Sequence, residues 1–346
     1  ALHATYVRST IAHANLVSID SSEALAMPGV AAIYTAADLE LVEIPATYNP
    51  AVSRTLLASG KVRYVGEPVA VVLTELANQG EDAAERVIPD YDFLEAYVDM
   101  ESAMAPDAIP LYESVGSNVV VDSTVFGMPG IADDAFDGCD VVVRARINNQ
   151  RVAPCPLEVR GSAAVWHDGR LIQWISSQHA QGAKSRIATT LGVEPDVVRI
   201  ITPDVGGGFG AKIDAYPEEV LLGMLAKRTG RPVRWRETRS ESMVALGHGR
   251  AQIQDVAIGG TRDGKVLAYT LKVYQDAGAF VDIGSILAPF MTRPMASGVY
   301  AIPRIDVHTV SVTTNTTPTV AYRGAGRPEA TAAIEDRKST RLNSSH

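Results

Sequence analysis

The glycine-rich segment Gly206-Gly207-Gly208-Phe209-Gly210 has the residue types and spacing of a ligand-binding loop. Four of its five residues are glycine, and it follows an apolar run. Because no Cβ atoms shield them, the backbone N–H groups of such a loop can bind an anion or lie against a flat ligand. A glycine-rich bend where two elements cross is the alternative.

The same loop also fits a nucleotide-binding motif. Gly206-x-Gly208-x-x-Ala211 matches the dinucleotide fingerprint, with Glu237 as the acid that would bind a ribose. In that fingerprint the helix begins within the glycines, so that the pyrophosphate lies at the helix N-terminus. Here Pro217 places the helix start about seven residues after the loop, which disfavours a nucleotide-binding module.

Two polar side chains could act beside this loop. Gln178 lies between a predicted strand and a predicted helix, where side chains commonly project into a cleft. Arg323 lies in a glycine-spaced segment after a strand and can present a rigid fork of donors to a carbonyl or a carboxylate. Taken alone, Gln178 is better explained as an exposed first-turn glutamine and Arg323 as a surface salt-bridge partner.

The elements that must position these residues follow from periodicity and from end signals. Strands are predicted at 171–176 and 197–201, and helices at 178–191 and Pro217–Thr229. The second helix has Pro at its first position, acids in its first turn and Gly230 after its last residue. Alternating strands and helices of this kind indicate an α+β protein.

Composition limits the class of protein. The formal net charge is −9, and Lys and Arg form no block longer than two residues, so a nucleic-acid or anionic-membrane surface is disfavoured. No uncharged apolar run approaches the roughly 20 residues that cross a bilayer. The two cysteines, Cys139 and Cys155, cannot form a disulfide framework or a four-cysteine metal site.

Taken in order along the chain, these residues and several flanking motifs resemble a known family. It is the molybdenum-binding large subunit of the xanthine dehydrogenase, aldehyde oxidase and carbon monoxide dehydrogenase family. The similar segments are Val7-Arg8-Ser9 with Ala12-His13-Ala14, Val62-Arg63-Tyr64-Val65-Gly66-Glu67-Pro68-Val69-Ala70, Ser176-Ser177-Gln178, Pro203-Asp204-Val205 with the glycine loop and Ala211-Lys212, Tyr216-Pro217-Glu218-Glu219, His248-Gly249-Arg250, Asp276-Ala277-Gly278-Ala279-Phe280 and Tyr322-Arg323-Gly324-Ala325-Gly326-Arg327-Pro328-Glu329.

The resemblance implies a domain organisation. Residues 1–105 would form a hammerhead-like α/β domain, 106–120 a linker, and 121–335 the first part of a molybdopterin-binding α+β domain. Residues 336–346 lose apolar periodicity and match what one frame of a sequencing adapter encodes, so we expect a non-native tail there.

The resemblance also implies cofactors and roles. Gln178 would hydrogen-bond the apical oxygen ligand of molybdenum. Gly207, Gly208, Phe209 and Gly210 would lie against the metal and the dithiolene of the molybdopterin, which is held without a direct protein ligand to molybdenum. Arg323 would contact the same centre and polarise the substrate. The cofactor could be the cytosine dinucleotide form.

In this family the general-base glutamate lies further downstream, so this stretch alone is expected to be inactive. Electrons would leave through an iron–sulfur small subunit and an FAD-binding medium subunit, in a dimer of heterotrimers. Family members of this type are mostly cytoplasmic.

Two departures from the family pattern bear on the substrate. Ile213 stands where purine-oxidising members place a glutamate, which argues against xanthine. Gly324 stands where the copper-containing carbon monoxide dehydrogenases carry a cysteine, which argues against efficient oxidation of carbon monoxide. An aldehyde or an N-heterocycle is therefore the expected substrate. The alternatives are a carbon monoxide dehydrogenase-like member without that cysteine, the nucleotide-binding module, and a non-catalytic scaffold.

Overall fold

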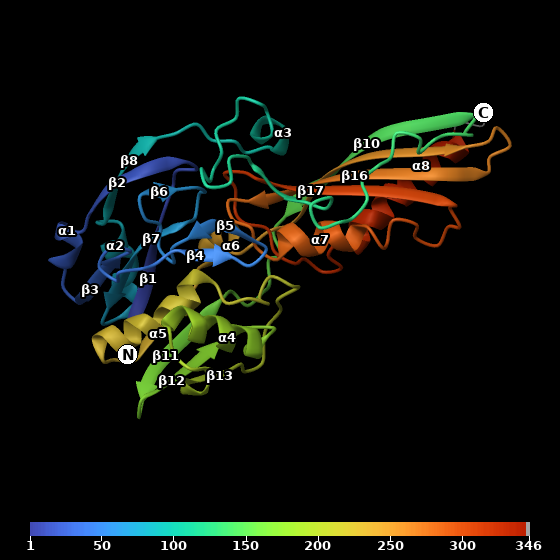
Figure 1. Ribbon diagram of the computed structural model, residues 1–346. Coiled ribbons are helices and arrows are strands. Elements are labelled where there is room, and N and C mark those ends of the chain that lie inside the picture. Colours follow the sequence, from blue (N-terminus) through green and yellow to red (C-terminus); the bar gives the residue numbers. More distant parts are fainter. Residues whose placement is uncertain (344–346) are drawn as a thin grey trace.

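Two large β-sheets, one of seven strands and one of five, form the frame of the part of the chain that the computed structural model describes (Figure 1). The description covers the backbone of residues 1–343 and the side chains of residues 1–335. The mixture of sheets with separate helices confirms the α+β prediction.

The seven-stranded sheet contains strands from residues 2–74 and from residues 161–236, in the order β13-β12-β11-β14-β1-β7-β3. Its strands are β1 (Leu2–Arg8), β3 (Val30–Thr35), β7 (Pro68–Thr74), β11 (Gly161–His167), β12 (Arg170–Ile175), β13 (Val198–Ile201) and β14 (Val233–Arg236). The junction is the parallel pairing of β1 with β14, where Leu2 is opposite Val233. The first hundred residues are therefore continuous with the later region through one sheet.

Two helices pack on this sheet, α4 (Ala180–Leu191) and α5 (Pro217–Thr229), and share its largest hydrophobic core. The bounds of α5 agree with the prediction, and Gly230 ends it in the left-handed region with φ 64°. Helix α4 begins two residues later than predicted, so Gln178 and His179 lie in the connection from β12 to α4. That connection carries a functional candidate rather than a first helical turn.

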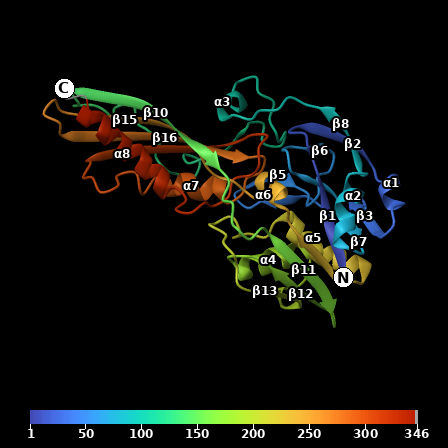
Figure 2. The same cartoon turned by 180° about the vertical axis from the view of Figure 1, so that it is seen from behind.

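The five-stranded sheet extends away from the first sheet, in the order β10-β15-β16-β17-β9. Its strands are β9 (Val119–Asp122), β10 (Val141–Val152), β15 (Gly249–Gly260), β16 (Val266–Gly278) and β17 (Arg304–Thr313). Helices α7 (Gly284–Thr292) and α8 (Arg327–Asn343) lie side by side along it, as both views show (Figures 1 and 2). Segment 314–326 leads from β17 to α8 and carries Arg323.

The remaining elements belong mostly to the first hundred residues. They are β2 (Ala14–Asp20), β4 (Ile44–Ala46), β5 (Asn49–Arg54), β6 (Lys61–Val62), β8 (Ile88–Phe93), α1 (Ser22–Leu25), α2 (Gly80–Ala84), α3 (Met100–Ala103), α6 (Arg239–Ala245) and two short 3₁₀ helices, Ala77–Gln79 and Pro195–Val197. Strands β6, β2 and β8 form a small sheet, and β4 pairs with β5. In the part of the chain that is described, no helix is long and apolar enough to cross a membrane.

The segment expected to be a linker, residues 106–120, is anchored to the rest of the protein by a few buried side chains. It contains no helix or strand before β9 begins at Val119. Leu111 and Tyr112 are nevertheless buried in a hydrophobic core, and the Tyr112 hydroxyl donates to the Ala279 carbonyl oxygen at 2.6 Å. The segment is thus anchored to the five-stranded sheet and does not act as a free tether.

The backbone of α8 continues through residue 336, where the tail was predicted to start, as far as Asn343. The last three residues of that tail, 344–346, lie outside the described residues. The origin of the tail stays a prediction.

Candidate functional site

Gln178 is held by the backbone that follows the glycine loop. Its Oε1 accepts hydrogen bonds from the N–H groups of Gly210 at 2.8 Å and Lys212 at 3.3 Å. Its own N–H donates to the Lys212 carbonyl oxygen at 2.7 Å. Because Oε1 is occupied, the side-chain amide can offer only its NH₂ group, and that group has no partner among the described residues.

The glycine loop lacks side chains where other groups approach closely. A Cβ on Gly208 would lie 2.3 Å from Gln178 Oε1, and a Cβ on Gly210 would lie 2.4 Å from the Ala321 carbonyl oxygen. Gly207 and Gly210 also have φ near +100°, a region that residues with a Cβ rarely adopt. Glycine is therefore required here by close contacts within the protein and by backbone conformation.

A single peptide group joins Gln178 to the segment that carries Arg323. The N–H of Gly210 donates to Gln178 Oε1, while the Phe209 carbonyl oxygen of the same peptide accepts from the Arg323 N–H at 2.9 Å. A trans peptide directs these two groups in opposite directions. The Phe209–Gly210 peptide therefore lies between Gln178 and Arg323 and brings the three predicted elements together.

Arg323 keeps its guanidinium exposed to solvent. Within the described residues that guanidinium makes no hydrogen bond or ion pair, whereas both backbone polar groups of Arg323 are bonded. Phe209, whose carbonyl oxygen accepts from the Arg323 N–H, is also exposed, at 42%. The planar guanidinium of Arg323 and the aromatic ring of Phe209 are therefore both exposed to solvent and can contact a ligand.

Lys212 anchors the glycine loop to the strand region that precedes it in the chain. Its buried ammonium donates to the carbonyl oxygen and to Oε2 of Glu158, both at 2.8 Å, and to Ser176 Oγ at 3.0 Å. Glu158 Oε2 also accepts from the N–H of Gly206 at 2.9 Å. Partial burial would raise the pKa of Glu158, but these hydrogen bonds from Lys212, Ser176 and Gly206 hold it below its ordinary value.

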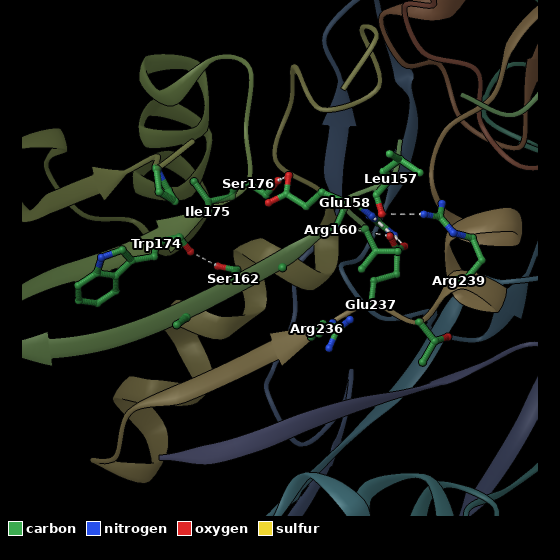
Figure 3. A pocket seen from close by; sticks show the side chains of 15 residues that line it. Leu157, Glu158, Arg160, Ser162, Trp174, Ile175, Ser176, Arg236, Glu237 and Arg239 are labelled. Carbon is green, nitrogen blue, oxygen red and sulfur yellow. Dashed lines mark hydrogen bonds and ion pairs between the residues drawn. The ribbon is translucent and has the colours of Figure 1, made fainter. Parts of the chain in front are cut away.

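An open cavity of about 800 Å³ lies next to this anchor (Figure 3). Residues 157–163 and 236–239 line it, together with Trp174, Ile175, Ser176 and Pro203. Figure 3 shows Glu158 beside Ser176 at one side of the cavity and Arg160 against Glu237 at its base.

Arg160 belongs to a buried network of charges that fixes the start of α5. It pairs with Glu237 through Nη2, it lies 3.3 Å from Glu218, and its guanidinium stacks 4.1 Å from the centre of the Tyr216 ring. Glu218 also pairs with Arg8 of β1 at 2.7 Å. Burial would raise the pKa of Glu218, but Arg160 and Arg8 lower it to about 2.

The neighbouring Glu219 shows what happens without such close cations. Its Oε2 accepts from the Tyr216 N–H at 2.9 Å. Burial, opposed only in part by Arg160 and by that hydrogen bond, raises the pKa of Glu219 to about 8. Adjacent carboxyl groups on one helix thus differ in charge state because they face different partners.

The structure brings Gln178, Gly207, Gly208, Phe209, Gly210 and Arg323 into one region, although their catalytic and cofactor-binding roles stay predictions. It also shows why the nucleotide-binding interpretation is disfavoured: α5 does start at Pro217, and the N–H groups of Gly206 and Gly210 already donate to Glu158 and Gln178.

Sequence reasoning assigned no role to Lys212, Glu158, Arg250 or Glu329, which hold these residues in place. Three of the four, Lys212, Arg250 and Glu329, lie within or beside the motifs quoted above. The presence of a charged residue in or next to a glycine-containing motif was the sequence signal that could have identified them as anchoring residues.

Two models of known protein families match this chain. Residues 1–95 match the family model of the aldehyde oxidase and xanthine dehydrogenase a/b hammerhead domain, and residues 111–337 match that of the molybdopterin cofactor-binding domain.

Two relatives are 33% identical to this chain over 96% of its length. One is the nicotine 6-hydroxylase large subunit of Paenarthrobacter nicotinovorans, of which 42% is covered. The other is the carbon monoxide dehydrogenase large chain of Hydrogenophaga pseudoflava, of which 44% is covered.

Among solved structures, quinoline 2-oxidoreductase from Pseudomonas putida 86 is similar with a TM-score of 0.90 and 31% identity, over 99% of this chain and 45% of that one. The aldehyde oxidoreductase from Desulfovibrio gigas has a TM-score of 0.89 and 28% identity, over 99% of this chain and 39% of that one. The chain spans less than half the length of these four relatives.

Proposed function

Because the chain belongs to the family of molybdopterin-binding large subunits that includes xanthine dehydrogenase, aldehyde oxidoreductase and carbon monoxide dehydrogenase, we propose that the protein containing it is a molybdenum-dependent hydroxylase. It would oxidise an aldehyde or an N-heterocycle with water as the source of oxygen. The observation that supports this proposal is the convergence of Gln178 and Arg323 on the Phe209–Gly210 peptide.

The residues present fit a molybdenum–pterin group. The unpartnered NH₂ of Gln178 is a donor suited to an oxygen ligand of a metal. The missing Cβ atoms at Gly208 and Gly210 let Gln178 and Ala321 approach the glycine loop closely, and the exposed Arg323 adds positive charge nearby. When bound, such a group supplies the two-electron oxidation and the transfer of oxygen from water, which protein side chains cannot perform.

Four groups of this chain would have a task in that reaction. Gln178 would donate its amide NH₂ to the cofactor, with the direction of the amide set by Gly210 and Lys212. Arg323 would direct its guanidinium at a substrate oxygen or nitrogen that gains negative charge in the transition state. The backbone of Gly207 to Gly210 and the Phe209 ring would border the bound cofactor and substrate.

The proposed substrate class rests on two positions that lack a side chain present in other members of the family. Ile213 replaces a carboxylate that would read a purine, and Gly324 provides no thiolate for a copper ion. We therefore favour an aldehyde or a simple N-heterocycle over xanthine and carbon monoxide.

Further parts of the proposal concern the rest of the assembly. A downstream glutamate would be the general base. An iron–sulfur subunit and an FAD subunit would carry electrons away, and the oligomer would be a dimer of heterotrimers in the cytoplasm. The carbon monoxide dehydrogenase large chain and a 6-hydroxypseudooxynicotine dehydrogenase complex subunit are relatives whose names describe parts of larger enzymes. The cytosine dinucleotide form of the cofactor is part of the same proposal.

The test is to produce the complete reading frame with its neighbouring genes and to measure molybdenum, pterin and nucleotide per subunit. We expect one molybdenum and one pterin, and turnover of aldehydes or N-heterocycles with an artificial acceptor. Arg323→Met should lower kcat by about 10²- to 10³-fold, as removal of one charge-stabilising donor does in other enzymes. A folded, metal-free and inactive protein that is stabilised by NAD or ATP would contradict the proposal.

A further inference from the structure

Arg250, at the start of β15, makes contacts that converge on the segment carrying Arg323. One end of its guanidinium, Nη1, pairs with Glu329 Oε1 at 3.0 Å. The other end, Nη2, donates to the carbonyl oxygen of Arg323 at 2.8 Å. The guanidinium also lies 4.6 Å from the centre of the Tyr322 ring, in the same segment.

Glu329 holds the far end of the same segment. Its side chain is fully buried, and its second oxygen, Oε2, accepts from the N–H of Gly326 at 2.8 Å. Arg250 and Glu329 together therefore hold residues 322–326 at both ends, through a backbone carbonyl at one end and a backbone N–H at the other.

The path of segment 322–326 is narrow. A Cβ on Gly326 would lie 2.3 Å from the Ala288 carbonyl oxygen, and a Cβ on Gly324 would lie 2.7 Å from the Pro328 ring. Ala325 has φ 28° between these two glycines, which have φ above +90°. Such a conformation persists only where surrounding contacts determine it.

A row of buried amides fixes Arg250 and Glu329 in turn. Gln275 Nε2 donates to the backbone oxygen of Arg250 at 2.9 Å, and Gln252 Nε2 donates to Gln275 Oε1 at 3.0 Å. Gln254 Nε2 donates to Gln252 Oε1 at 2.8 Å and to the Glu329 backbone oxygen at 3.3 Å. Arg250 and Glu329, together called the clamp below, are thus tied to β15 and β16 rather than to a surface loop.

The backbone of Arg323 is consequently held on both sides. Its N–H donates to the Phe209 carbonyl oxygen at 2.9 Å, and its carbonyl oxygen accepts from Arg250. Only its guanidinium is left exposed and without a partner among the described residues.

We propose that Arg250 and Glu329 are positioning residues that set the direction in which Arg323 presents its guanidinium to the substrate. The catalytic role of Arg323 in this inference rests on the proposed function. The contacts that Arg250 and Glu329 make with its segment do not depend on it. An ordinary structural ion pair would stabilise the fold without any preference for Arg323. A displacement of about 1 Å at a catalytic group can cost about 100-fold in rate, so a positioning role has a kinetic signature.

The sharpest variant is Arg250→Lys in the complete protein with its partner subunits. A lysine keeps the charge opposite the buried Glu329, but one ammonium on a flexible stem cannot reproduce the planar fork that reaches both Glu329 and Arg323. The matched control is Arg151→Lys. Arg151 pairs with Asp276 at 2.7 Å and donates to the Thr317 carbonyl oxygen at 2.7 Å, so its polar contacts lie outside residues 322–326.

Two measurements separate this inference from the proposed function. The first is amide hydrogen exchange of residues 322–327 with and without cofactor, which needs no activity. We expect faster exchange in Arg250→Lys and in Glu329→Gln than in the wild type, and no change there in Arg151→Lys. Unchanged exchange in both clamp variants would overturn the inference, whether or not the enzyme holds molybdenum.

The second measurement is kinetic and is normalised to molybdenum content. We expect Arg250→Lys to lower kcat on the order of 10- to 100-fold with little change in molybdenum per subunit. The double variant Arg250→Lys/Arg323→Met should be no slower than Arg323→Met alone, because both changes act through the same guanidinium. Multiplying losses, or a loss in Arg151→Lys equal to that in Arg250→Lys, would overturn the inference. A wild type without molybdenum would defeat the proposed function and leave the exchange measurement to decide the clamp.

Discussion

The two sides of the candidate site are anchored by ion pairs of opposite design. On the glycine-loop side, residues 176–179 and 206–212, the cation is the buried partner: the Lys212 side chain is 1% exposed and that of Glu158 is 36% exposed. On the Arg323 side, residues 321–327, the anion is the buried partner: the Glu329 side chain is 0% exposed and that of Arg250 is 14% exposed.

This difference predicts which member of each ion pair can be removed at a low cost in stability. Glu158 is exposed enough for water to solvate its carboxylate when its cation is removed, whereas the buried carboxylate of Glu329 is not in contact with water. Breaking a buried pair is costly because it leaves an uncompensated charge in the interior, while an exposed partner loses little. The two sides should therefore respond unequally to the same kind of substitution.

Arg250→Met should produce the largest loss of stability. It leaves Glu329 buried without its cation, and we expect the free energy of unfolding to fall by about 3–5 kcal/mol. Urea unfolding of the complete protein measures this. As a control, Arg304→Met removes an ion pair to Asp134 whose side chains are 37% and 65% exposed, and it should cost far less because water solvates the remaining carboxylate. Equal losses in the two variants would mean that burial does not decide the cost.

Gly210→Ala should come next, because it acts where the two sides meet. The new Cβ would lie 2.4 Å from the Ala321 carbonyl oxygen, on a residue with φ +101°. We expect a loss of about 2–4 kcal/mol, of which about 1–2 kcal/mol is the left-handed conformation itself. Gly138→Ala isolates that second contribution, since Gly138 has φ +80° and no neighbour within 4 Å of its Cβ position. If both alanine variants lose the same stability, the contact between the two sides is not tight.

Lys212→Met should cost less than Arg250→Met, at about 1–2 kcal/mol, because the main loss is of hydrogen bonds to Glu158 and Ser176 rather than of charge compensation. The same urea unfolding compares the two variants directly. A loss as large as that of Arg250→Met would break the proposed contrast.

The smallest expected effect is the pH dependence of stability that the Glu158 carboxylate causes in the wild type. Because hydrogen bonds hold the pKa of Glu158 below its ordinary value of 4.5, the folded protein binds its proton less readily than the unfolded chain does. The resulting stability is fully present above pH 4.5 and is lost as the pH falls through the lowered pKa.

Glu158→Gln leaves the buried Lys212 ammonium without its anion, so at pH 7 we expect it to destabilise the protein by more than Lys212→Met does. The difference in Tm between wild type and Glu158→Gln should narrow as the pH is lowered from about 5 to about 3. A gap that stays constant or widens in acid would show that the carboxylate charge does not contribute to the anchor.

Local signals in the sequence were enough for the elements that flank the site. The bounds of α5 follow from Pro217 at its first position and Gly230 after its end, and both signals act within one helical turn. The predicted start of α4 is two residues too early because Gln178 bonds to the backbone of residues 210–212 instead of joining a helical turn, and that contact depends on a distant segment.

The sequence by itself determined the α+β class, the helices α4 and α5, the glycine loop and the ordered motifs that point to a family, because each depends on residues close together in the chain. Only the tertiary structure decided that β1 pairs with β14, that one peptide lies between Gln178 and Arg323, and that Glu329 is the partner of Arg250. These contacts join residues separated by 32 positions, for Gln178 and Gly210, up to 231 positions, for Leu2 and Val233. Burial and pairing at such separations are set by packing, and no local pattern encodes them.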